Sequence, residues 1–216
     1  MLAGFACPLS TKENILQAHK TFGETRMSTA KALTATEVQQ VLDYIAKHNY
    51  PQRNKLMFLM TVAAGVRVGE LSCLTIGDVV NEDGSVRSEV FLSADRVKHG
   101  HARTVYINTR LQAELAEYIT ERTWLDNTQP LFYTHRGPRR SFSPNTLAQH
   151  FHYVYKRAGV KQGSSHSGRK TFLTSLASQG ISVFVLASLA GHKSITTTQK
   201  YVTVNADMNR RAVELV

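Results

Sequence analysis

Acidic residues are missing from a long C-terminal part of this chain. No aspartate or glutamate occurs from Asn127 to Ala206, an interval of 80 residues that holds ten of the 26 lysines and arginines. The remaining residues carry 16 basic and 16 acidic side chains and are neutral. A surface of one sign attracts a polyanion and makes binding sensitive to salt. The distribution predicts a nucleic-acid partner; an acidic protein or a membrane surface is the alternative, but no basic amphipathic anchor stands out.

Cysteines and long apolar runs are also scarce. The two cysteines, Cys7 and Cys73, exclude a disulfide scaffold and a CxxC metal clip, and they favour a reducing compartment. The longest apolar stretch, Leu56–Val66, is too short to span a bilayer, and the first seven residues lack the features of a signal peptide. We therefore expect a soluble, cytoplasmic protein with no membrane partner.

Metal-ligand patterns are absent as well. The nine histidines form no HExxH and no Cys/His zinc spacing, and the basic interval has no carboxylates for Mg²⁺. The sequence therefore predicts neither a metal nor a cofactor, and it argues against a metal-dependent nuclease.

The apolar spacing predicts mostly helices. We expect residues 1–33 to form an N-terminal arm and an ordered domain to fill 34–216, beginning at a capping box formed by Thr34 and Glu37. Thr109 is expected to cap a later helix. Helices are expected over 35–48, 51–64, 68–74, 109–123, 144–158, 167–179, 183–190, 194–201 and 207–215, with short strands over 88–93, 103–107 and 131–134. The predicted class is mainly α with a small antiparallel β-sheet (α+β).

Several polar residues have ordinary explanations when each is taken alone. An arginine such as Arg67, between two apolar helices, commonly forms a helix-end salt bridge, and Glu70 is its obvious partner. Lys98 on a hairpin tip is typical of a solvated charge. His166 and Arg169 share a helix face, His192 follows the helix stop Gly191, and Tyr201 is one of eight tyrosines and by default half-buried.

Taken in order, the same residues resemble the active-site signature of the tyrosine recombinases, the phage-integrase family of DNA strand-exchange enzymes. The first box reads Ala64-Gly65-Val66-Arg67-Val68-Gly69-Glu70-Leu71, the second reads His166-Ser-Gly-Arg169, and the last runs from Leu189-Ala-Gly-His192 to Tyr201. Lys98, followed by Arg103-Thr-Val-Tyr-Ile107, resembles the family's hairpin lysine and its returning strand. The resemblance implies a tyrosine-recombinase catalytic-domain-like, DNA breaking–rejoining fold over residues 34–216.

The resemblance also implies roles. Tyr201 would attack the scissile phosphorus and hold the DNA as a 3′-phosphotyrosyl ester, so that a second end is joined without metal or ATP. Arg67 and Arg169 would bind the non-bridging oxygens, since a planar guanidinium donates two parallel bonds. Lys98 would protonate the leaving 5′ oxygen, with His99 and His101 as alternatives. His166 would assist proton transfer at the tyrosine, and His192 would donate to a phosphate oxygen.

Two features depart from the family pattern. The second box here is His166-Ser-Gly-Arg169-Lys170, where His-x-Leu-Arg-His is more usual. Gly168 in a first helical turn costs about 1 kcal/mol against alanine, and we expect it to allow a close approach of DNA. Members usually carry a separate core-binding domain, whereas only residues 1–33 precede the first expected helix, and Met27 is an alternative start. The layout predicts a catalytic domain with no full core-binding domain, similar to the fimbrial-switch invertases or a truncated integrase.

The implied function is a site-specific recombinase or integrase acting on a double-stranded DNA recombination site. We expect a monomer in the free state and a homo-tetramer on DNA. The C-terminal segment Asp207–Val216 joins the copies in this interpretation; the alternatives are that this segment docks on its own chain, in cis, and that residues 1–33 make the contact. The alternative is a non-enzymatic DNA-binding regulator on the same scaffold, although such a protein has no need of a nucleophile. A relaxing topoisomerase is chemically close, but the boxes are more similar to those of integrases.

Overall fold

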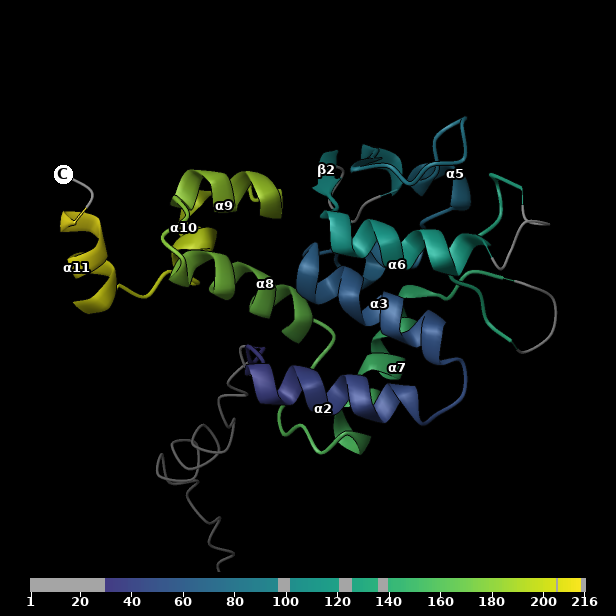
Figure 1. Ribbon diagram of the computed structural model, residues 1–216, viewed down its shortest axis with the longest axis horizontal. Coiled ribbons are helices and arrows are strands. Elements are labelled where there is room, and N and C mark those ends of the chain that lie inside the picture. Colours follow the sequence, from purple (N-terminus) through teal and green to yellow (C-terminus); the bar gives the residue numbers. More distant parts are fainter. Residues whose placement is uncertain (1–29, 97–101, 121–125, 136–139, 205, 215–216) are drawn as a thin grey trace, which may run out of the picture.

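Helices dominate the part of the chain that the computed structural model describes, which is residues 30–96, 102–120, 126–135, 140–204 and 206–214. Figure 1 shows a larger body beside a smaller group of helices formed by the residues from 167 onward. The mainly α class with one small antiparallel sheet is confirmed. In chain order the elements are α2 (Ala35–Ala46), α3 (Pro51–Ala63), α4 (Val68–Leu71), α5 (Ile76–Val79), β1 (Glu89–Leu92), the 3₁₀ turn η1 (Ala94–Arg96), β2 (Arg103–Tyr106), α6 (Thr109–Thr120), α7 (Pro144–Arg157), α8 (Ser167–Ser178), α9 (Val183–Ala190), α10 (Ile195–Gln199) and α11 (Ala206–Val213).

Local signals explain most helix starts. The capping box is formed as expected, because Thr34 Oγ1 accepts from the Glu37 amide at 3.2 Å and Glu37 Oε2 accepts from the Thr34 amide at 3.0 Å. The prediction for α6 was wrong by one residue: Asn108 Oδ1 accepts from the Leu111 amide at 2.9 Å, so Asn108 caps the helix.

The sheet is a two-stranded antiparallel ladder in which Val90 pairs with Val105 and Leu92 with Arg103. Alternate residues face the core, and Arg103 takes one of these inward positions. The strand expected over 131–134 is wrong, because the described residues there form only the isolated bridges Thr75–Pro130 and Tyr133–Ser141. The residues that join the two strands, 97–101, lie outside the described ranges.

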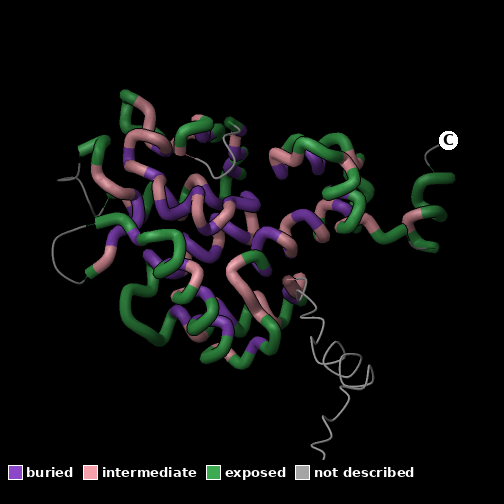
Figure 2. The backbone as a smooth tube through the Cα atoms, turned by 180° about the vertical axis from the view of Figure 1, so that it is seen from behind, coloured by how far each residue is buried: buried purple, intermediate pink, exposed green. Residues whose placement is uncertain are grey.

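Helix α3 is the centre of the body. It packs against α2, α6 and α8, and Met57, Phe58 and Met60 on it are fully buried. Figure 2 shows that burial continues along α8 into the smaller helical group, whereas α11 lies at its far end with no buried residue. None of the helices in the described ranges has both the length and the apolarity that crossing a bilayer requires.

Close packing explains one glycine that the sequence left ambiguous. A Cβ on Gly168 would lie 2.0 Å from Thr61 Oγ1 and 2.7 Å from Thr61 Cβ, both on α3. Gly168 is buried. The expectation that this glycine admits DNA was therefore wrong; it allows the first turn of α8 to lie against α3.

Candidate active site

Arg67 stands at the start of α4, directly after the turn that ends α3. Gly65 makes this turn with φ +63°, a conformation that a side chain would strain. The Arg67 amide donates to Glu70 Oε2 at 2.7 Å and its Nη1 donates to Glu70 Oε1 at 2.6 Å. Nη2 donates to the carbonyl of Ala190, at the end of α9, at 2.9 Å. The ordinary salt bridge to Glu70 is thus present, and the side chain stays one-third exposed at 33%.

Arg169 reaches the same place from α8. It is only 6% exposed, and its Nη1 donates to the Gly65 carbonyl at 2.6 Å. Nη2 donates to the Ala190 carbonyl and lies 3.4 Å from His192 Nε2. Burial lowers the pKa of Arg169 to about 9, with repulsion from Arg67 adding to the effect. The guanidinium therefore remains protonated at neutral pH.

His192 follows the left-handed residue Gly191, which ends α9 with φ +57°. Its Nδ1 lies 2.9 Å from the hydroxyl of Thr198, a fully buried residue of α10. Burial first, and then the nearby arginines, lower the pKa of His192 to about 4. A guanidinium can only donate, so in the neutral ring Nε2 accepts from Arg169 and Nδ1 donates to Thr198.

Tyr201 completes this group. Its ring stacks near that of His192, with centroids 6.0 Å apart and planes inclined by 20°. The turn after α10 fixes its backbone, since the Tyr201 amide donates to the Thr198 carbonyl at 2.9 Å. Four of the six predicted residues, Arg67, Arg169, His192 and Tyr201, are therefore brought together from three separate segments.

The other two predicted residues are placed less fully. His166 is exposed at the N-cap of α8, one turn before Arg169, and its amide donates to Ser164 Oγ at 3.3 Å. Lys98 lies outside the described residues, as do His99 and His101. The described elements on either side of them are η1, which ends at Arg96, and β2, which begins at Arg103.

Glu70 is the buried acid of the site. It is 2% exposed and pairs with both Arg67 and Arg103 at 2.6 Å. Burial alone would raise the pKa of Glu70, but the bonds and charges of Arg103 and Arg67 outweigh it and lower the pKa to about 2. Its carboxylate therefore stays ionised and balances part of the charge of three guanidiniums.

Arg103 and Thr198 contact residues of the site but were not predicted to do so from the sequence. Arg103 and Val105 occupy alternate positions of β2 that both face the core. A charged residue at such a position of the expected strand could have indicated a buried ion pair. Thr198 gave no such signal. No group of histidine, cysteine, aspartate or glutamate in the described residues is arranged to hold a metal ion.

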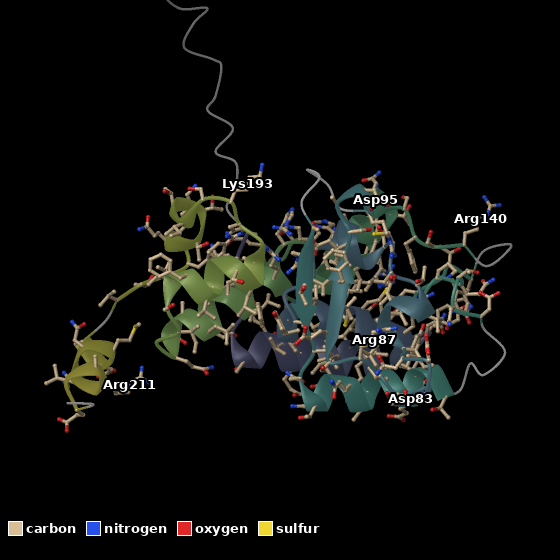
Figure 3. The ribbon with its side chains drawn as sticks, turned by 90° about the horizontal axis from the view of Figure 1, so that it is seen from above. Asp83, Arg87, Asp95, Arg140, Lys193 and Arg211 are labelled. Carbon is tan, nitrogen blue, oxygen red and sulfur yellow. The ribbon has the colours of Figure 1, made fainter. Side chains whose placement is uncertain are left out.

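Charged residues of both signs lie along the edge of the molecule that carries Lys193. In Figure 3, Lys193, which follows His192, and Arg140 lie along this edge with Asp95 between them, whereas Asp83 lies along the opposite edge. The site itself offers guanidinium donors, a phenol and an imidazole. Chemically, these groups suit a phosphate diester and attack on its phosphorus by an oxygen nucleophile.

Comparisons with known proteins agree with the motifs. Residues 31–208 match the model of the phage integrase family. Tyrosine recombinase XerA of Pyrococcus furiosus is 33% identical over 185 residues, which cover 85% of this chain and 61% of that protein. Tyrosine recombinase XerC of Pelobacter propionicus is 31% identical over 163 residues, or 74% of this chain and 51% of that protein. This chain thus spans about three-fifths of the length of the first of these curated relatives.

Solved structures show the same fold. A crystal structure of XerA recombinase aligns with a TM-score of 0.66 at 26% identity, covering 85% of this chain and 64% of that one. The Tn1549 transposon integrase in complex with a circular intermediate DNA aligns with a TM-score of 0.72 at 20% identity, covering 89% and 68%. The family match, which extends over most of the chain, shows that this protein belongs to the phage integrase family.

Proposed function

We propose that this chain is the catalytic domain of a site-specific tyrosine recombinase, which cleaves and rejoins double-stranded DNA through a 3′-phosphotyrosyl intermediate without metal or ATP. The observation that carries the proposal is the convergence at the end of α9, where the Ala190 carbonyl accepts from both Arg67 and Arg169 beside His192. We propose residues 34–216 as this domain; Leu33 already lies in its core, with its amide donating to Thr171 Oγ1 at 2.8 Å, and residues 1–29 of the expected arm lie outside the described residues.

The two arginines bind the scissile phosphate. Bonds to Glu70 and the Ala190 carbonyl fix the plane of the Arg67 guanidinium before DNA arrives, and bonds to the Gly65 and Ala190 carbonyls fix that of Arg169. Fixed donors stabilise the charge that develops on the pentacovalent phosphorus, because they need no reorientation during the reaction. Burial is the main cause of the lowered pKa of Arg169, and repulsion from Arg67 and Arg103 adds to it; an anionic phosphate would offset this repulsion.

Tyr201 is the nucleophile. A phenol has a pKa near 10, so attack requires that a proton leave as the bond to phosphorus forms. His166, exposed at the adjacent end of α8, takes this proton. The phosphate is thereby transferred to Tyr201 Oη and the 5′ oxygen leaves; Lys98 supplies the proton that this oxygen needs.

His192 acts on a phosphate oxygen. In the free protein its Nε2 faces Arg169 as an acceptor. When a phosphate takes the Arg169 donor, the negative charge raises the pKa of the imidazole, and Nε2 is free to carry a proton and donate. Thr198 holds the other ring nitrogen throughout.

A non-enzymatic DNA-binding regulator is the second candidate. It would use the same excess of basic residues to bind DNA and would tolerate loss of Tyr201 without consequence. The stacking of Tyr201 on His192, next to two buried or half-buried arginines, favours the enzyme.

The test is covalent capture. A library of duplexes with a randomised central segment and a nick within it is incubated with the full chain in EDTA, denatured in SDS, and protein-linked DNA is recovered and sequenced. The wild-type chain is expected to yield adducts that share a sequence, and Tyr201→Phe is expected to bind the recovered DNA without forming any. Absence of wild-type adducts, or adducts that appear only with Mg²⁺, would contradict the proposal.

The proposed function also requires several copies of the protein to assemble on DNA. Recombination joins two duplexes, so we propose a monomer in solution and a tetramer on paired sites. α11 has no buried residue in the described chain, and Val213 on it is 69% exposed. α9 exposes Phe184 and Val185, with Ile181 just before it. A helix this short is marginal alone, and docking α11 onto this face of a neighbouring copy would cover both surfaces.

A further inference from the structure

Arg103 is a buried cation at an inward position of a strand. Its side chain is 4% exposed, and its neighbour on the same face of β2 is Val105. Burying a charge is strongly unfavourable unless it is paired and hydrogen-bonded. A leucine or valine could occupy this strand position without the cost of burying a charge, so the contacts of this arginine require an explanation.

The guanidinium of Arg103 joins three segments that are distant in sequence. Nε donates to Glu70 Oε1 at 3.0 Å and Nη2 to Glu70 Oε2 at 2.6 Å, which makes a two-pronged pair with α4. Nη1 donates to the Leu189 carbonyl in the last turn of α9 at 2.7 Å. Nη2 also lies 3.4 Å from the Gly65 carbonyl, just after α3. These bonds occupy four of the five N–H groups of the side chain.

Each of these contacts leads directly to a residue of the proposed active site. Glu70 is the carboxylate that also holds Arg67, and the Gly65 carbonyl is shared with Arg169. Leu189 precedes Ala190, whose carbonyl accepts from Arg67 and Arg169. A Cβ on Gly191 would lie 2.7 Å from Arg103 Cδ, so the arginine stem also packs against the residue before His192.

We propose that Arg103 is a positioning residue for the recombination chemistry, an inference that rests on the proposed function. It lies beneath the site, since its side chain is 4% exposed where that of Arg67 is 33% exposed, and the protein takes most of its donors. It holds α4, the end of α9 and the turn after α3 at fixed separations, and thereby sets Arg67, Arg169 and His192 against one phosphate.

The helix geometry explains why an arginine does this better than an apolar residue. The last carbonyls of a helix carry partial negative charge and accept donors from outside the helix. At the end of α9, Arg103, Arg67 and Arg169 all bind such carbonyls. Without Arg103, the Leu189 carbonyl loses its donor and Glu70 keeps only Arg67, so α9 can shift relative to α4. Displacement of catalytic groups by about 1 Å can slow a reaction by about a hundredfold.

Arg96 provides a matched control on the other side of the same segment. It also forms a two-pronged pair with a carboxylate, donating to Asp78 Oδ1 at 2.7 Å and Oδ2 at 2.6 Å, and it donates to the Cys73 carbonyl. In the described chain neither Asp78 nor Cys73 forms a hydrogen bond to Arg67, Arg169, His192 or Tyr201, and Cys73 meets the site only through its bonds to the backbone carbonyl of Glu70. Arg96→Met therefore removes a comparable ion pair next to the Lys98 segment without disturbing α9.

The experiment measures single-turnover adduct formation at saturating concentrations of the captured, nicked DNA, with the rate constant and the final adduct fraction read separately. For Arg103→Met we expect a rate constant lowered by about tenfold to a hundredfold, with the DNA affinity and the final fraction unchanged. Arg96→Met is expected to keep the wild-type rate constant. Arg103→Lys retains a cation for Glu70 and is expected to fold, yet one ammonium cannot replace the fork, so its rate constant should lie between those two.

Three results would overturn the inference while leaving the proposed function intact. The first is a wild-type rate constant for Arg103→Lys. The second is a lowered final fraction at an unchanged rate constant for Arg103→Met, which would assign Arg103 to folding alone. The third is equal slowing by Arg96→Met, which would assign both arginines to general anchoring of the chain between η1 and β2. No adduct from the wild-type chain would contradict the proposed function, and the inference would fall with it.

Discussion

Gly168→Ala sets two physical effects of opposite sign against each other. Gly168 lies in the first turn of α8, where helix propensity alone favours alanine by about 1 kcal/mol. The added Cβ, however, would lie 2.0 Å from Thr61 Oγ1 and 2.7 Å from Thr61 Cβ, and such separations are not sustained in proteins. Thr61 is 1% exposed and its hydroxyl donates to the Phe58 carbonyl at 2.7 Å, so it cannot turn away freely.

Relief therefore requires that α8 move away from α3, where the two helices pack most closely. Overpacking of this kind costs about 1–3 kcal/mol, and after the gain of about 1 kcal/mol in propensity we expect a net loss of up to about 2 kcal/mol. For a domain of this size such a loss lowers the melting temperature by up to about 8 °C. Because Arg169 follows Gly168 directly, the same shift should slow adduct formation.

The assay is thermal or urea unfolding of wild type, Gly168→Ala, and Gly168→Ala combined with Thr61→Gly. The double variant removes both clashing atoms and should regain part of the stability lost by the single variant, despite the cost of a glycine inside α3. A Gly168→Ala variant more stable than wild type by about 1 kcal/mol would show that propensity alone governs the position. That result would refute the packing explanation.

Three further outcomes are expected. Lys98→Ala should slow cleavage of ordinary DNA strongly and recover on a 5′-bridging phosphorothioate, whose leaving group needs no proton; equal defects on both substrates would assign Lys98 to binding. Deleting residues 207–216 should abolish cooperative binding to paired half-sites and spare binding to one half-site, and unchanged cooperativity would place the contact elsewhere. Burial, with repulsion from Arg53, lowers the pKa of His150 to about 4, so the unfolded chain takes up a proton first as the pH falls from about 6.5. The free energy of unfolding should therefore decrease between pH 6.5 and 4, by at most about 3 kcal/mol from this group, and urea titrations should show a smaller decrease for His150→Gln.

Much of the fold could be predicted because its signals are local. The capping box of Thr34 and Glu37 and the left-handed Gly191 each depend on a few neighbouring residues, and both are confirmed. The error over 131–134 has a different origin. Those residues are apolar because Leu131 and Phe132 enter the core, and their backbone pairs only at single bridges. Apolar spacing alone does not distinguish a buried loop from a strand.

In the candidate site, too, local motifs predicted some residues, whereas the roles of others depend on contacts between distant segments. Arg67, Arg169, His192 and Tyr201 were identified by ordered motifs, and the structure brings them together. The roles of Gly168 and Arg103 depend on contacts with α3, α4 and α9, which are distant in sequence. Helix propensity marks Gly168 as unfavourable, and the alternating pattern marks Arg103 only as the first residue of a strand. Neither rule takes account of the surface against which the residue packs.

The proposed nucleophile can be identified from the residue that carries the covalent link to DNA. The adduct captured from nicked DNA is digested with nuclease and protease, and the modified peptide is sequenced by mass spectrometry. We expect a nucleotide joined through its 3′ phosphate to Tyr201. A nucleotide on Tyr153, Tyr155 or any other residue, or a linkage to a 5′ phosphate, would contradict it.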